Sequence, residues 1–237
     1  MNHPIAISVV IPAYNEEGNV RLAVQSVERV LSGLSLSHEM IVVDDGSTDR
    51  TGAIARSLAR KNPHLRVTSN AVNRGFGFSF QKGMRLARGT YVTVFPSDNE
   101  MAAQSFRFLV RARGRADLVT TYPDSPRMRT PLRMALSWLF TLGMNRTFRL
   151  RLRYFNGPLI SRRAFLRALP LVSDRYTIFA EIIVRLVSSG CTHHEVPFRY
   201  TPRRRGVSKA VTVQSFLSTA RAYVTLVRDV YFLKKTL

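Results

Sequence analysis

The chain has 237 residues, of which 45% are hydrophobic and 22% charged, and these ordinary values exclude a wholly disordered protein. Its 36 lysines and arginines outnumber 15 aspartates and glutamates, which gives a net charge of +21. A surface this basic is expected to meet an anion: nucleic acid, anionic lipid or a phosphorylated substrate. The single cysteine, Cys191, excludes an internal disulfide framework and a cysteine-based zinc site, and is typical of a reducing compartment.

The first half of the sequence alternates apolar runs with helical spacing. The apolar runs are rich in β-branched residues and predict buried strands at 5–11, 40–43, 65–68, 91–95 and 118–121. Helices are expected between them, at about 20–31, 48–58, after the glycine-punctuated stretch 73–83, and around 106–110. This order predicts an α/β fold with a mainly parallel sheet flanked by helices.

The second half is less regular. We expect a helix at 131–148, a short strand pair within 152–161, a helix at 176–189, a strand at 192–200 and a basic loop at 203–206 before a final helix. The helix at 131–148 has arginines flanking an apolar face of Leu132, Leu136, Leu139, Phe140 and Met144. Because no linker separates the halves, we expect one domain over residues 1–210. Residues 211–237 would then form a C-terminal amphipathic helix packed on the domain or on a membrane.

No stretch reaches the ~20 apolar residues that a spanning helix needs. The longest uncharged run is 134–145, and the apolar stretch 211–233 is interrupted by Arg221, Arg228 and Asp229. The N-terminus lacks a basic region, and Pro12 breaks its apolar run early, so no signal peptide is expected. These features predict a cytosolic protein that lies on a membrane surface.

Three polar clusters follow predicted strands, at 15–17, 44–47 and 97–100. In an open parallel sheet the carboxyl ends of the strands meet at one edge, which is where ligands bind. Carboxylates gathered there can accept hydrogen bonds from a nucleoside or hold a divalent cation. Each cluster alone is explained by ordinary turn chemistry, but three of them at successive strand ends favour a binding site.

Two of these clusters lie in longer motifs. Residues 9–16 (VVIPAYNE) and 42–49 (VVDDGSTD) resemble the opening motifs of family 2 glycosyltransferases of the GT-A fold, and 73–75 (NRG), Gly83 and 87–89 (ARG) continue that pattern. Later positions are similar to the polyprenyl-phosphate sugar transferases, the dolichyl-phosphate mannosyltransferase branch: Glu181, residues 195–197 (EVP), Arg203, Gly206, Ser208 and Lys209. The resemblance covers the chain up to about residue 209, and it implies a donor-binding half at about 1–122 and an acceptor-side half at about 123–210.

The resemblance implies roles for individual donor-site residues. Asp45 would contact the nucleoside, while Asp44 organises the turn, and Gly75 would let the backbone approach the donor closely. The nucleotide pocket would be lined by Pro12, Tyr14 and Glu16. The basic loop would close over the donor and place Arg203 and Lys209 on its diphosphate.

Asp98 occupies the second aspartate of the family's DxD signature, which holds a divalent cation, Mg²⁺ or Mn²⁺, on the donor diphosphate. Pro96 replaces the first aspartate and offers no ligand atom. If residues 98–100 are extended, Asp98 and Glu100 face the same side, so Glu100 would restore the lost carboxylate. The alternatives are weak metal binding, with arginines neutralising the leaving group, and an inactive enzyme.

On the acceptor side, Arg127, Arg129, Arg133 and Ser137 resemble a polyprenyl-phosphate site, where arginine grips phosphate oxygens bidentately. An ionised phosphate needs no strong general base, so attack on the anomeric carbon with inversion is expected. Glu181 matches an acidic position that would orient the sugar or the acceptor. Residues 127–153 fit an interfacial helix among anionic headgroups and, equally, a helix packed on the core.

The sequence therefore predicts an inverting hexosyltransferase that moves a sugar from a nucleoside diphosphate to a polyprenyl (dolichyl or undecaprenyl) phosphate at the cytosolic membrane face. One alternative is a family 2 enzyme with a glycan or another lipid as acceptor, which would not use Arg129 and Arg133 as phosphate ligands. Another is a basic nucleic-acid-binding module, which the charge of +21 alone supports. The acidic clusters argue against that module, so no nucleic-acid partner is expected.

Overall fold

The computed structural model describes residues 4–124, 131–201, 221 and 223–232, without the side chains of residues 132 and 133. Seven strands form one sheet in the order β3-β2-β1-β4-β6-β5-β7. All neighbouring strands pair in parallel except β6, which is antiparallel to both β4 and β5. The strands are β1 (Ile7–Ala13), β2 (His38–Asp44), β3 (Leu65–Ser69), β4 (Tyr91–Val94), β5 (Leu118–Pro123), β6 (Leu159–Arg162) and β7 (His193–Phe198). The predicted α/β fold with a mainly parallel sheet is confirmed.

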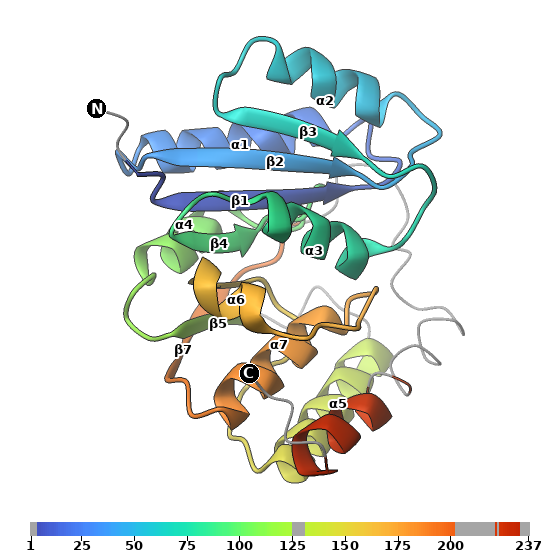
Figure 1. The fold of residues 1–237 in the computed structure, drawn as a ribbon, viewed down its shortest axis with the longest axis vertical. Coiled ribbons are helices and arrows are strands. Elements are labelled where there is room, and N and C mark those ends of the chain that lie inside the picture. The colour runs from blue at the N-terminus through green and yellow to red at the C-terminus, as the bar shows by residue number, and fades with distance from the viewer. Residues whose placement is uncertain (1–3, 125–130, 202–220, 222, 233–237) are drawn as a thin grey trace.

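Helices cover both faces of the sheet, and Figure 1 shows α3 and α6 in front of it with α1 and α4 behind. The helices are α1 (Val20–Ser32), α2 (Thr51–Ala59), α3 (Phe76–Leu86), α4 (Ala103–Arg111), α5 (Pro131–Phe148), α6 (Arg163–Ala168) and α7 (Ile178–Ser188). β1 is buried along its whole length because it has a layer on each side: Val9 and Ile11 pack with α1 and α4, and Val10 packs with α3 and α7. This is why the strand reads as a continuous apolar run.

The second half departs from expectation at residues 152–161. The expected strand pair is wrong, because only β6 is a strand, and it lies between β4 and β5 and pairs with both of them instead of with a second strand within 152–161. α6 follows it directly and has no counterpart among the predicted helices. The helix expected at 176–189 and the strand expected at 192–200 are confirmed as α7 and β7.

α5 buries only part of the apolar face that its sequence showed. Met144 and Phe148 are buried, whereas Leu136 and Leu139 are about half exposed and Trp138 is 63% exposed. The end of α5 packs against the C-terminal segment, which we define as residues 221 and 223–232. Tyr231 of this segment donates a hydrogen bond to the Thr147 carbonyl and stacks on Phe148. No helix among the described residues is long and apolar enough to cross a membrane.

Candidate functional site

The loops after β1 and β2 bind each other at the carboxyl edge of the sheet. The Asn15 N–H donates to Ser47 Oγ (3.0 Å), and Asn15 Oδ1 accepts from the Thr48 N–H (2.9 Å). One turn further, the Glu16 N–H donates to Thr51 Oγ1 (2.7 Å). Two of the three polar clusters predicted from sequence therefore form one joined surface, as their place at successive strand ends implied.

Asp45 is the buried centre of this edge, with 3% of its surface exposed. Its carboxylate accepts hydrogen bonds from Asn70 Nδ2 (2.7 Å), the Arg74 N–H (3.0 Å) and the Gly75 N–H (2.8 Å). Asp44 accepts from the Ser47 N–H (3.1 Å) and so closes its own turn. Asp45 thus holds the segment 70–75 in place, and its contact with a nucleoside stays a prediction.

Gly75 is required by the protein's own backbone. Its φ of +95° favours glycine, and a Cβ there would lie 2.5 Å from the Asp174 carbonyl oxygen. Gly77, one residue into the first turn of α3, is equally confined, because a Cβ would lie 2.7 Å from the Ser173 carbonyl oxygen and 2.6 Å from that of Arg175. The segment 172–175 therefore presses directly on the start of α3. A close approach of a donor to Gly75 stays a prediction.

The three residues expected to line the nucleotide pocket lie at the end of β1. Pro12 is buried within the strand, and Tyr14 and Glu16 follow it, half-buried. The Glu16 carboxylate accepts from Asn19 Nδ2 (2.6 Å), and its carbonyl accepts from the first N–H groups of α1. Glu16 thus fixes the turn into α1, and its side chain lies at the edge where the sequence placed the nucleotide.

The loop carrying Asp98 and Glu100 lies at the end of β4. The condition under which Asp98 and Glu100 would face the same side, an extended backbone, is not met, because Asn99 has a φ of +58° and Asp98 Oδ1 accepts from the Glu100 N–H (3.1 Å). The side chains of Asp98 and Glu100 are therefore not related by strand alternation. Asn99 Nδ2 donates to the Asn19 carbonyl (2.9 Å), which joins this third cluster to the start of α1.

The donor set of this loop is compatible with a magnesium-type ion. Mg²⁺ is usually held by one or two carboxylates together with substrate phosphates and water. Asp98 and Glu100 supply two carboxylates, and Pro96 supplies no ligand. No group of three or more histidine, cysteine, aspartate or glutamate side chains that could hold a metal occurs in the described part of the chain. Two carboxylates match the number that such an ion takes from a protein when a diphosphate supplies further oxygens, and metal binding by Asp98 and Glu100 stays a prediction.

Thr201, which precedes the basic loop, is bound to the loop that carries Asp98 and Glu100. The Thr201 N–H donates to the Glu100 carbonyl (2.9 Å), and Thr201 Oγ1 donates to the Asn99 carbonyl (2.6 Å). Thr201 is the last described residue before the segment that carries Arg203 and Lys209, which lie outside the described residues.

Glu181 lies in α7 and is fully buried. Its carboxylate accepts from the N–H groups of Val172 (3.1 Å) and Ser173 (2.8 Å) and from Arg185 Nε (3.0 Å). Glu181 therefore fixes the backbone of the segment 172–175. Its effect on sugar or acceptor orientation stays a prediction and, in this geometry, acts through that segment.

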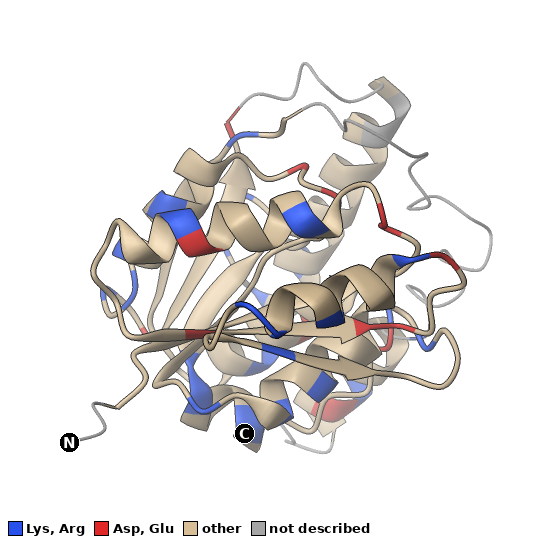
Figure 2. Cartoon of the chain, turned by 90° about the horizontal axis from the view of Figure 1, so that it is seen from above, with Lys and Arg blue, Asp and Glu red and all other residues tan. Residues whose placement is uncertain are grey.

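The predicted acceptor-phosphate site is only partly within the described chain. Arg127 and Arg129 lie outside it, and Arg133 lies on α5 with its side chain not described. Ser137 is half-buried on the same helix. The acceptor site therefore stays a prediction. Figure 2 shows lysines and arginines spread over helices on both faces of the sheet, so the positive charge is not confined to α5.

Sequence reasoning missed an aromatic and arginine cluster at the ends of β5 and β7. The Arg153 guanidinium lies over the Tyr122 ring, 4.4 Å from its centroid, and the Arg153 N–H donates to Glu195 Oε1 (2.9 Å). The hydroxyls of Tyr154 and Tyr200 are 3.5 Å apart. Tyr122 and Tyr200 both stand at the ends of predicted strands, which is the signal that could have placed them at this edge.

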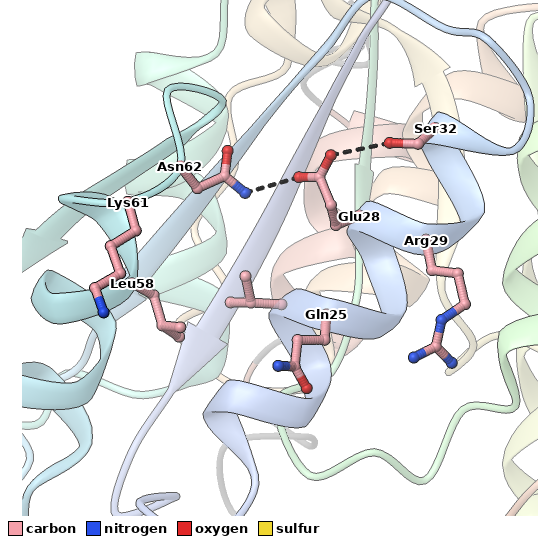
Figure 3. Close-up of a pocket in the computed structure, with 8 residues that line it drawn as sticks. Gln25, Glu28, Arg29, Ser32, Leu58, Lys61 and Asn62 are labelled. Carbon is pink, nitrogen blue, oxygen red and sulfur yellow. Dashed lines mark hydrogen bonds between the residues drawn. The ribbon is translucent and has the colours of Figure 1, made fainter.

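Figure 3 shows a groove between α1 and α2. It is lined by the second half of α1 and the end of α2, away from the carboxyl ends of the strands. Glu28 accepts hydrogen bonds there from Asn62 Nδ2 (2.8 Å) and Ser32 Oγ (3.0 Å). Burial raises the pKa of Glu28, but the hydrogen bonds from Asn62 and Ser32 and the nearby His38 outweigh it and hold the pKa below its usual value. Glu28 therefore joins the two helices, and this groove is separate from the candidate site.

Comparison with known proteins identifies related sequences and a related fold. The family described as "Glycosyl transferase family 2" matches residues 8–168. The uncharacterized glycosyltransferase YibD of Escherichia coli is 31% identical over 110 residues, which is 46% of this chain and 31% of that protein. This chain thus spans about a third of that relative. Dodecaprenyl-phosphate galacturonate synthase of Rhizobium johnstonii is 25% identical over 240 residues, covering 97% of this chain and 68% of that protein.

Among solved structures, glucosyl-3-phosphoglycerate synthase of Mycobacterium tuberculosis in complex with Mg²⁺ and uridine diphosphate has the same fold. The TM-score is 0.70 and the sequence identity 20%, with 93% of this chain and 79% of that chain covered. The described sheet and its helices are therefore those of the GT-A fold.

Proposed function

The chain belongs to glycosyl transferase family 2, and we propose that it moves a sugar from a nucleoside diphosphate to a polyprenyl phosphate at the cytosolic face of a membrane. It is a glycosyltransferase with the GT-A fold. The observation that carries the proposal is the joining of three loops at one edge: 14–17 to 47–51, Asp45 to 70–75, and Asn99 to Asn19. This edge is where parallel sheets bind nucleotides.

The donor half of the reaction needs a held nucleotide and a stabilised leaving group. Tyr14 and Glu16 would flank the nucleoside, and Asp45 keeps the 70–75 segment fixed beside it. Asp98 and Glu100 are the residues that would hold a divalent cation, which supplies positive charge to the departing diphosphate. Arg203 and Lys209 would close over the same diphosphate, and the hydrogen bonds of Thr201 to residues 99 and 100 support this because they start the basic loop beside Asp98.

In the transfer step, an oxygen of the acceptor phosphate forms a bond to the anomeric carbon. The bond from that carbon to the donor diphosphate breaks, and the nucleoside diphosphate leaves with both electrons of the bond. Because the acceptor oxygen is already ionised, no side chain has to remove a proton from it. Arg127, Arg129, Arg133 and Ser137 would position the acceptor phosphate. Similarity to a dodecaprenyl-phosphate galacturonate synthase over 97% of the chain supports a polyprenyl-phosphate acceptor.

A membrane-facing surface is needed to reach such a lipid. α5 exposes apolar side chains at Met134, Leu136, Trp138, Leu139 and Leu142, and the C-terminal segment that packs on it exposes Val224, Tyr231 and Phe232. Figure 1 shows the two elements side by side at one end of the molecule. Arg146 and Arg149 follow on α5 and just beyond it, and their charge complements anionic headgroups. We define these eight apolar residues as the apolar surface.

Donor binding is tested by calorimetric titration with UDP and with GDP, each with and without Mn²⁺, on the unmodified protein and on Asp98→Asn. We expect one nucleotide to bind, and its affinity to fall at least tenfold without Mn²⁺ or with Asp98→Asn. The matched control is Asp117→Asn. Asp117 comes directly before β5 and therefore lies at the amino end of that strand, away from the donor site. Nucleotide binding that ignores both metal and Asp98 would refute the metal assignment, and no binding of either nucleotide would refute the donor site.

Acceptor choice is tested by transfer to a short-chain polyprenyl phosphate in Arg129→Ala and Arg133→Ala, with Arg167→Ala on exposed α6 as the control. We expect the first two to lose most of the activity. Unchanged activity would move the acceptor to a glycan or another lipid.

The membrane surface is tested by sedimentation with phosphatidylglycerol vesicles. Trp138→Asp with Leu139→Asp should abolish binding, whereas Phe108→Asp, an exposed aromatic on α4, should not. Equal loss in both variants would refute the assignment.

A further inference from the structure

Arg185 is the largest side chain that the described fold buries completely. Its Nε donates to Glu181 Oε1 (3.0 Å) one turn back on α7, and a terminal nitrogen donates to Asp229 Oδ2 (2.7 Å) in the C-terminal segment. Asp229 is itself buried, and its other oxygen accepts from the exposed Arg228 (3.0 Å). One buried guanidinium thus joins α7 to the C-terminal segment.

Glu181, which binds Arg185, also binds the segment 172–175. Its carboxylate accepts from two successive backbone N–H groups, those of Val172 and Ser173. Because the Glu181 charge is balanced by Arg185, a weakened Arg185 contact leaves a buried carboxylate without its cation. Relaxation of that carboxylate would move the backbone it holds.

The segment 172–175 in turn holds the beginning of α3. The Asp174 carbonyl accepts from the N–H groups of Gly77 (2.8 Å) and Phe78 (3.2 Å), and the Ser173 carbonyl accepts from Gln81 Nε2 (2.9 Å). The first N–H groups of a helix need such outside acceptors, and Gly75, which precedes α3, has no side chain to cap it. The Asp174 carbonyl therefore takes the place of a side-chain cap, and the Ser173 carbonyl holds α3 through the Gln81 side chain.

Gly75 contacts both the segment 172–175 and Asp45 of the candidate donor site. Asp45 accepts from the Gly75 N–H on one side, and the Asp174 carbonyl lies on the other, too close to admit a Cβ. A shift of 172–175 therefore changes the position of Gly75 and, through it, the segment that Asp45 holds. Packed and hydrogen-bonded backbone of this kind transmits displacement rather than absorbing it.

We infer that Arg185, Glu181 and Asp229 are positioning residues for the donor pocket, and that the C-terminal segment sets nucleotide affinity through them. The inference rests on the proposed donor site. The C-terminal segment also carries part of the apolar surface, at Val224, Tyr231 and Phe232. Within the described part of the chain, the segment contacts α5 and α7 and not the donor pocket itself. Its effect on nucleotide affinity is therefore indirect, through Arg185 and Glu181.

The test uses Asp229→Asn, which removes the charge but keeps the shape, in the full-length chain. The control is Asp117→Asn, whose carboxylate also accepts two hydrogen bonds, both from Thr192, at the amino end of β5. We expect the nucleotide Kd from calorimetry to rise threefold to tenfold in Asp229→Asn, with stoichiometry unchanged. A purely structural role would lower the stoichiometry and leave the Kd as it was, and that result would overturn the inference.

Hydrogen exchange separates this inference from the proposed function, because it needs no nucleotide. Amides of Val172, Ser173, Gly77 and Phe78 should exchange at least threefold faster in Asp229→Asn than in Asp117→Asn. Unchanged exchange at these amides would overturn the inference whatever the nucleotide result. If Asp229→Asn does not fold, Arg228→Gln, whose side chain is 62% exposed, should shift the same amides in the same direction by a smaller factor.

Discussion

Replacing Asp45 with asparagine tests whether one carboxylate holds the donor edge together. In the better of its two orientations, the amide oxygen of the new side chain keeps the hydrogen bonds from Asn70 and the Arg74 N–H, which both reach the same oxygen. The amide NH₂ then faces the Gly75 N–H, which loses its acceptor. Losing one charge-assisted bond and leaving a buried N–H unpaired costs about 3 kcal/mol.

The loss is measured by urea unfolding followed by circular dichroism. With an m-value of about 3 kcal/mol/M, a loss of about 3 kcal/mol lowers the unfolding midpoint by about 1 M. Asp117→Asn is the control, and its midpoint should fall much less, because Asp117 and Thr192 meet at an exposed edge. Nucleotide affinity should fall together with stability in Asp45→Asn, and it should stay unchanged in Asp117→Asn. An unfolding midpoint equal to that of the unmodified protein would refute the reasoning, since the Asp45 charge and its hydrogen bond from the Gly75 N–H would then contribute nothing.

Three further results are expected. Gly77→Ala should lower the melting temperature, because its Cβ meets backbone atoms of residues 173–175, at a cost of about 1–3 kcal/mol; an unchanged melting temperature would contradict the packing described. Gly143→Ala, where a Cβ meets no described atom within 4 Å, should instead raise the stability by about 0.5–1 kcal/mol as a better helix former in α5, in the same thermal scan. Burial raises the pKa of Asp229, but hydrogen bonds from Arg185 and Arg228 outweigh it and lower the pKa, so its stabilisation is complete above the usual aspartate pKa of about 4 and is lost as pH falls through the lowered value. Urea titrations should accordingly show a constant difference between the unmodified protein and Asp229→Asn from pH 7 to about 5, which narrows below about pH 4; a difference that stays constant in acid would contradict this.

The first half of the fold could be predicted because its signals are local. β1, β2 and β4 each contain an apolar, β-branched run, and the polar residues that follow them mark the edge where the strands end. The turn role of Asp44 follows from the same local chemistry. The conformation of 98–100 could not be predicted, because spacing alone does not show that Asn99 takes a positive φ.

Long-range contacts account for the rest. β6 is four residues long and pairs with strands distant in sequence, so nothing local distinguishes it from a turn. The connection from Arg185 to Asp229 spans 44 residues. One signal was present: Glu181 and Arg185 are an i, i+4 pair of opposite charge within the otherwise apolar stretch of α7, where an exposed pair would not be expected.

The place of β6 also fixes an order of events during synthesis. β5 pairs only with β6 and β7 among the described strands, so when the ribosome has made residues 118–123 they have no strand to join. β1 to β4 can assemble first, and β4 keeps an open edge until residues 159–162 emerge and close it. A chain cut between β5 and β6 would therefore leave β4 with an open edge and β5, β6 and β7 without their partner strands, rather than two working pieces. Fragments divided near residue 123 should aggregate when expressed apart and regain a complete sheet only when made together.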